Sequence, residues 1–179
     1  METTETRSNF GLNYGLIAGL VITVITLLQY LGGLDMYLSP IGYVSYLVII
    51  TMAVLAALKV RKTNEGFLEF SQALKVTFTV FVIAFFIQTV FTYILFNFID
   101  VSFREAVAQE ALNSAEKLMK KIGLSDSQID EQLEKERSSN PFSFFKVLLG
   151  YALTCIVAFI FCLLISLIVK KSKPAFHNI

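Results

Sequence analysis

The sequence predicts an all-α integral-membrane protein: one domain over residues 1–179 with four transmembrane helices and an amphipathic helical hairpin between the third and fourth. Hydrophobic residues make up 55% of the chain and charged residues only 16%, whereas roughly 25% is charged in an average soluble domain. The hydrophobic residues gather in four runs without charges in their interiors, each long enough to cross a hydrocarbon core of about 30 Å. Charged residues concentrate in one island at residues 100–140.

The first span is expected over residues 10–31. A cleaved signal peptide is the alternative interpretation, but such a leader has a basic start and an apolar core of about 7–15 residues. Here only Arg7 accompanies Glu2 and Glu5, and the apolar run is longer. We therefore expect a retained helix. Small residues recur at every fourth position of this helix: Gly11, Gly15 and Gly19.

The second and third spans are expected over residues 40–58 and 74–99. Ser39-Pro40 starts the second span with an N-cap residue followed by proline at the first helical position. The third span is crowded with phenylalanine, so we expect it to pack loosely, with several rings facing lipid or filling grooves beside the glycines. Its deepest polar side chain is Gln88. That residue either makes an interhelical hydrogen bond or lines a pore.

The charged island is expected to form a hairpin of two amphipathic helices over residues 101–138. Two capping boxes and one glycine C-terminal cap define the helix ends: Ser102 with Glu105, Ser125 with Gln128, and Gly123. Asp126, Asp130 and Glu134 share one face of the second helix. We interpret this face as solvated, and a divalent-cation site is the alternative.

The last span is expected over residues 142–169, after a start signal at Asn140-Pro141. It carries a second row of small residues: Gly150, Thr154, Ala158, Cys162 and Ser166. In lipid, small residues that let backbones approach closely are a main device of helix association. We therefore expect this row to face the row of the first span at the centre of the bundle. Homodimerisation through the same faces is the alternative.

Basic residues near the short loops predict the orientation. They occur at Arg7, in the link 59–75 and in the tail at 170–173, whereas the link around Asp35 has none. Four spans place the three basic segments on one side, which we expect to be cytoplasmic. Both termini would then be cytoplasmic, and the hairpin would be extracytoplasmic.

Several classes of function are disfavoured by the residue types present. A net charge of +1 leaves no excess of cations to neutralise phosphates, so we expect no nucleic-acid partner. The chain has no P-loop, no dinucleotide fingerprint and no Gly-x-Ser-x-Gly motif. A zinc site needs three or four ligands, but His177 lies in the tail and Cys155 and Cys162 lie in the last apolar run, so the chain offers no cluster of His and Cys to supply them. We expect no cofactor, no metal and no catalytic residues.

Four stretches carry a resemblance to a known family. They are Asn9–Gly19, Phe70–Lys75, Phe96–Asp100 and Met119–Gln132. With the four-span layout, they resemble a bacterial integral-membrane family, domain-of-unknown-function family 4199, over nearly the whole chain. The resemblance implies a bacterial inner (cytoplasmic) membrane location and offers no functional residues to transfer.

Two functions from different classes remain. The first is a non-catalytic scaffold or accessory subunit that binds a protein partner through the hairpin. The second is a small passive channel or transporter subunit, lined by Gln88, Thr77 and Thr92 and self-associating through the glycine face. The interiors of the spans lack ionisable residues, which argues against ion-coupled transport. A membrane enzyme would have to take its acid–base pair from the hairpin. The lipid bilayer is the partner that the composition itself requires.

Overall fold

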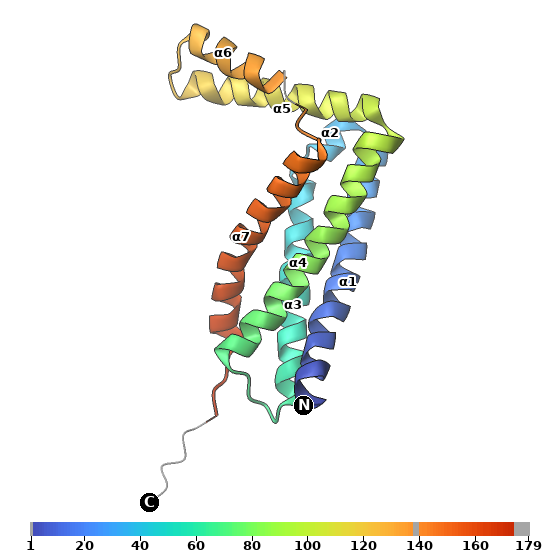
Figure 1. The fold of residues 1–179 in the computed structure, drawn as a ribbon, viewed down its shortest axis with the longest axis vertical. Helices are drawn as coiled ribbons and strands as arrows, with labels where there is room; N and C mark the ends of the chain where they lie inside the picture. Colours follow the sequence, from blue (N-terminus) through green and yellow to red (C-terminus); the bar gives the residue numbers. More distant parts are fainter. Residues whose placement is uncertain (1, 138–139, 174–179) are drawn as a thin grey trace, which may run out of the picture.

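A computed structural model describes residues 2–137 and 140–173, and these residues form an all-α fold (Figure 1). The elements in chain order are α1 (Glu2–Leu31), α2 (Leu34–Tyr37), η1 (Pro40–Gly42), α3 (Tyr43–Thr63), α4 (Phe70–Ile94), η2 (Leu95–Ile99), α5 (Val101–Lys121), α6 (Asp126–Arg137) and α7 (Phe144–Val169). Within the described residues, 4 helical segments are long and apolar enough to cross a membrane: Asn9–Leu31, Pro40–Thr63, Phe70–Ile99 and Phe144–Val169. The predicted four spans, with a helical hairpin between the third and fourth, are confirmed. His177 lies outside the described residues.

The four spanning helices form a bundle with α4 at its centre. The start of α1 and the end of α7 lie at one end of the bundle, and the α5–α6 hairpin lies across the other (Figure 1). Helix α4 contacts α1, α3 and α7. Its buried surface consists largely of small and β-branched residues with two phenylalanines: Ala73, Val76, Thr77, Val80, Phe81, Ala84 and Phe85. The expectation that this span packs loosely is therefore wrong, because its small residues share one face.

The glycine row of α1 lies against α4. A Cβ atom placed on Gly15 would stand 2.9 Å from the Cβ of Ile83 and 3.3 Å from the Cα of Val80. Gly11 and Gly19 lie equally close to α4, since a Cβ atom on either would meet α4 atoms at 3.3 Å or less. Two helices approach this closely only where one of them presents no side chain.

The small residues of α7 divide into a packed half and an open half. Ala158, Cys162 and Ser166 are buried, and Thr154 is half-buried. A Cβ atom on Gly150 would have nothing within 4 Å. No contact joins α1 and α7 in the part of the chain that the structure describes, and α4 lies between them (Figure 1). The expectation that the two small rows face each other is therefore wrong.

Aromatic side chains form a large part of the contact between α4 and α7. Phe78 of α4 meets Phe159 of α7 with ring centroids 5.5 Å apart, and Phe86 meets Tyr151 at 6.0 Å. The Tyr151 hydroxyl donates to the backbone oxygen of Val82 at 3.2 Å. These rings fill the space between the two backbones, so the contact does not depend on a row of glycines.

Helix α5 begins at a different cap from the one predicted. The Oδ1 atom of Asp100 accepts a hydrogen bond from the backbone N–H of Phe103 at 2.8 Å, so Asp100 is the N-cap. The expected capping box at Ser102 is therefore wrong, because Ser102 already lies inside the helix. The π-helical turn η2 continues α4 as far as Asp100, whose non-helical backbone (φ −139°, ψ 85°) separates it from α5.

The remaining helix ends follow local signals more closely. Gly123 has a φ of 84° and terminates α5 in the left-handed conformation expected of a glycine cap. The backbone N–H of Ser125 donates to Oε1 of Gln128 at 3.1 Å, which is one of the two bonds of the predicted capping box. Asn140 Oδ1 accepts from the backbone N–H two residues later, and α7 begins at Phe144.

At the other end of the bundle, the loop between α3 and α4 pairs with the segment after α7. Leu68 and Lys171 exchange two backbone hydrogen bonds of 2.8 Å each. The Nζ atoms of Lys171 and Lys173 lie 5.9 and 5.8 Å from the centre of the Phe67 ring. This pairing, which we call the terminal clasp, attaches the end of α7 to the rest of the bundle.

Candidate functional site

The hairpin rests on an aromatic cluster at one end of the bundle, here called the hairpin seat. Leu95, Phe96 and Val107 are buried in it. Partly buried residues from α1, α2, α4, α5 and the start of the last span surround them: Tyr30, Leu34, Tyr37, Phe91, Phe103 and Phe142. The rings of Phe96 and Phe142 pack edge to face with centroids 4.8 Å apart. Segments far apart in the chain therefore meet at the root of α5.

Polar bonds fix the same root. The Oδ2 atom of Asp100 accepts a hydrogen bond from the Tyr30 hydroxyl at 3.0 Å. Asn97 donates from Nδ2 to the backbone oxygen of Phe142 at 3.2 Å, and its Oδ1 lies 3.4 Å from the donating Nη1 of Arg104. These bonds join the start of α5 to α1 and to η2, and they join η2 to the segment before α7. The orientation of the hairpin is thereby fixed by both packing and hydrogen bonds.

The outer half of the hairpin projects past the bundle (Figure 1). Ile129 and Leu133 of α6 are buried, and α5 is the only helix that α6 contacts among the described elements. On the outer part of α5, Leu118 and Ile122 remain 61% and 66% exposed. The apolar stripe of α5 therefore packs into the hairpin seat at the start of the helix and is exposed at its end.

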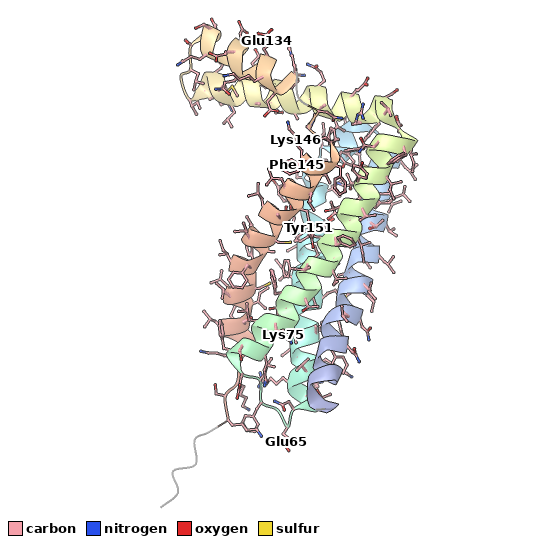
Figure 2. All side chains as sticks on the ribbon, viewed as in Figure 1. Glu65, Lys75, Glu134, Phe145, Lys146 and Tyr151 are labelled. Atoms are coloured by element: carbon pink, nitrogen blue, oxygen red, sulfur yellow. The ribbon has the colours of Figure 1, made fainter. Side chains whose placement is uncertain are left out.

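The hairpin surface is charged. Lys120 Nζ lies 2.6 Å from Glu116 Oε1, and Lys135 Nζ lies 2.7 Å from Glu131 Oε1. The Lys120 ammonium lowers the pKa of the Glu116 carboxyl, and the carboxylate in turn raises the pKa of Lys120. Glu134 stands on the outer helix of the hairpin (Figure 2). Within the described residues, no three His, Cys, Asp or Glu side chains gather closely enough to hold a metal ion.

A polar cavity of about 390 Å³, the α1–α3–α4 cavity, lies near the hairpin end of the bundle. Its walls come from the last turns of α1, the link through α2 and η1, the first turn of α3, and α4. Its polar lining residues are neutral: Thr26, Gln29, Tyr37, Ser39, Tyr43, Ser45, Tyr46 and Gln88. Burial raises the pKa of Tyr37, so its hydroxyl keeps its proton at physiological pH.

Two glutamines reach this cavity, and only one of them was singled out from the sequence. Gln88 Nε2 donates to Thr26 Oγ1 at 3.3 Å, which joins α4 to α1. Gln29 is only 5% exposed, and its Nε2 atom has no hydrogen-bond partner among the described residues. The signal that could have found Gln29 is its polarity inside an otherwise apolar helix.

The cavity does not continue through the bundle. Toward the clasp end, the helices close around a layer of fully buried apolar residues: Ala18, Ile22, Ile49, Ala53 and Ala84. Thr77, predicted to line a pore with Gln88, is buried elsewhere, where its hydroxyl lies 3.3 Å from that of Ser166. Neither Thr77 nor Thr92 lines the cavity.

A bundle of four apolar helices with a hairpin between the last two defines a multi-span, all-α membrane protein, and the bilayer is its partner. The chain belongs to the family described as protein of unknown function DUF4199, which it matches over residues 13–171. That match covers most of α1, the other three spans and the hairpin, and it confirms the resemblance drawn from the sequence. No curated protein and no solved structure matches the chain.

Proposed function

We propose that this protein is a non-catalytic membrane scaffold or accessory subunit whose hairpin binds a protein partner outside the bilayer. The observation that carries the proposal is the combination of a fixed root and a projecting outer half. An element already held in one orientation loses little conformational freedom when a partner binds it. The hairpin seat and the hydrogen bonds of Asp100 and Asn97 hold α5 in this way.

The chemistry of α6 indicates the kind of partner surface. Acidic side chains outnumber basic ones along this helix, and its exposed acidic residues are Asp126, Asp130, Glu131, Glu134 and Glu136. Such a surface favours encounter with a basic patch and sets orientation more than affinity. The exposed Leu118 and Ile122 would supply the apolar part of the contact.

We further propose that the hairpin lies outside the cytoplasm and that both termini lie inside it, in a bacterial inner membrane. Support comes from the basic residues at the opposite end of the bundle. Lys171 and Lys173 lie beside Phe67 in the terminal clasp, and Arg61 and Lys62 close α3 at that end. Cytoplasmic loops carry such an excess of Lys and Arg.

The packing below the α1–α3–α4 cavity counts against a passive channel through a single chain. A solute that entered the cavity would have to separate α1, α3 and α4 at the layer containing Ile22 and Ile49, both fully buried. Opening such a layer would remove close-packed contacts along several turns. The accessory-subunit proposal requires no such opening.

Site-specific photocrosslinking in native membranes tests the proposal. A photoreactive residue would replace Glu134 on the hairpin, and the matched control would carry it at Glu65 at the opposite end (Figure 2). We expect one discrete crosslinked protein from position 134 that is absent from position 65. Asp130→Lys in the position-134 protein should reduce its yield. Recovery of the same crosslinked protein from position 65, or of no discrete crosslinked protein from position 134, would refute the proposal.

A further inference from the structure

We infer that the α1–α3–α4 cavity binds the uncharged headgroup of a membrane lipid, with hydroxyl and ester carbonyl oxygens of the glycerol type as its ligand atoms. The volume of about 390 Å³ falls within the range of roughly 300–1,000 Å³ typical of small-molecule sites. The cavity lies where α1 ends and α3 begins. That position matches the depth of lipid headgroups and glycerol in a bilayer.

The strongest indication of a ligand is the unpartnered amide of Gln29. The side chain is 95% buried, since only 5% of the residue is exposed, and its Nε2 atom lacks a hydrogen-bond acceptor among the described residues. An amide donor buried in this way costs free energy unless something supplies an acceptor. A hydroxyl or carbonyl oxygen entering the cavity would supply it.

Gly42 keeps the space beside this donor open. A Cβ atom at Gly42 would stand 3.5 Å from Gln29 Nε2, with no other heavy atom within 4 Å. The backbone of Gly42 is ordinary right-handed helix, with φ −53° and ψ −30°, so conformation does not require a glycine there. The lack of a side chain instead leaves room next to the amide for a ligand atom.

The lining selects an uncharged group. Amides and hydroxyls supply the polar part of the wall, and no Asp, Glu, Lys, Arg or His contributes to it. A phosphate would lack a cation to pair with, and an ammonium would lack a carboxylate. Gln88 already donates one amide N–H to Thr26, whereas the Nε2 atom of Gln29 has no acceptor among the described residues. Neutral hydroxyl and carbonyl oxygens therefore match the site better than an ionic headgroup does.

The rim of the cavity favours a lipid over a water-borne solute. Tyr43 and Leu38 line it and are 71% and 43% exposed. Tyr46 and Phe85 add an apolar wall, with ring centroids 6.0 Å apart. Acyl chains attached to a headgroup in the cavity would lie along these side chains. A free polyol would gain nothing from them.

Native mass spectrometry of the full chain in detergent tests the inference, with dioleoylglycerol as the probe and dioleoylphosphatidylglycerol and free glycerol for comparison. We expect dioleoylglycerol to bind one equivalent more tightly than either. Gln29→Leu, which removes the donor at similar volume, should weaken binding by about tenfold, the loss expected for one hydrogen bond of ordinary strength. Gly42→Ala, which fills the adjoining space, should also weaken it.

The matched control is Gln109→Leu, which removes an exposed amide on the hairpin and should leave dioleoylglycerol binding unchanged. Thermal unfolding without added lipid would show that Gln29→Leu is folded. Its midpoint should equal or exceed that of the wild type, because an unpaired buried donor is gone. Equal dioleoylglycerol affinity of Gln29→Leu and wild type would overturn the inference. So would equal binding of phosphatidylglycerol or free glycerol, or no binding of dioleoylglycerol.

Discussion

Alanine at Gly15 and alanine at Gly150 should have opposite effects on stability, although both glycines belong to rows of small residues. In Gly15→Ala the new methyl carbon would lie 2.9 Å from Ile83 Cβ and 3.3 Å from Val80 Cα. Favourable carbon–carbon contacts lie at about 3.5–4.0 Å, so α1 and α4 must move apart by several tenths of an ångström. In Gly150→Ala the methyl carbon would meet nothing within 4 Å.

The magnitude follows from the difference between the two variants. Both gain up to about 1 kcal/mol because alanine favours the helix over glycine, and this gain cancels in the comparison. Overpacking a well-packed contact costs about 1–3 kcal/mol, and only Gly15→Ala incurs it. For a chain of this size, 1 kcal/mol shifts the unfolding midpoint by roughly 2–4 °C. The midpoint of Gly15→Ala should therefore lie about 2–12 °C below that of Gly150→Ala.

Thermal unfolding in one detergent, followed by circular dichroism and by a thiol-reactive dye, measures this difference. Cys162 is fully buried, whereas Cys155 is only partly buried. In a Cys155→Ala background, reaction of the remaining thiol therefore reports opening of the bundle. Phe86→Leu is a useful control because Phe86 is 54% exposed and leucine keeps an apolar side chain beside Tyr151, so its effect should be small. Equal midpoints for the two alanine variants, or a lower one for Gly150→Ala, would refute the assignment of the close contact to α1 and α4.

Three further predictions follow from the hairpin and the helix ends. Asp100→Ala should lower the free energy of unfolding by about 1–2 kcal/mol because it removes the N-cap of α5. Ser102→Ala should change the stability little. Equal losses for the two variants in thermal unfolding would contradict this assignment of the cap. In a background free of native cysteines, an impermeant maleimide applied to intact cells should label a cysteine at Glu134 but not one at Glu65. Labelling of both cysteines, or of the Glu65 cysteine alone, would contradict the proposed topology. The neighbouring Lys120 lowers the pKa of Glu116. The Glu116 carboxylate therefore stabilises α5 fully at pH values above the ordinary carboxyl pKa, and this stabilisation is lost as the pH falls through the lowered pKa. Amide exchange in α5 from pH 7 to pH 3 should show the loss in wild type and not in Glu116→Gln.

The sequence was sufficient for elements defined by local signals. Each span is a long apolar run, and a single segment in lipid satisfies all its backbone hydrogen bonds internally only as a helix. Gly123 ends α5 as predicted because a left-handed position there favours glycine. The span limits differ mainly at α3, which continues to Thr63. The basic residues expected to follow that span instead occupy its last turns.

Helix pairing could not be predicted in the same way. A glycine row shows that one backbone can be approached closely, but it does not say by which helix. The α4 residues that contact the glycine row, including Val80 and Ala84, alternate along the sequence with phenylalanines. The cap at Asp100 depends on the π-helical turn before it, which no local motif announced. The polarity of Gln29 could have marked it in the sequence, but its missing hydrogen-bond acceptor is known only from the fold.

The terminal clasp has a consequence for the register of α7. Leu68 pairs with Lys171 beyond one end of this helix, and Asn97 binds the backbone oxygen of Phe142 before the other. Sliding by a single turn, about 5.4 Å, would break both attachments at once. The axial position of the helix is thus set from its two ends, which leaves the residues between free to vary in size where they face lipid.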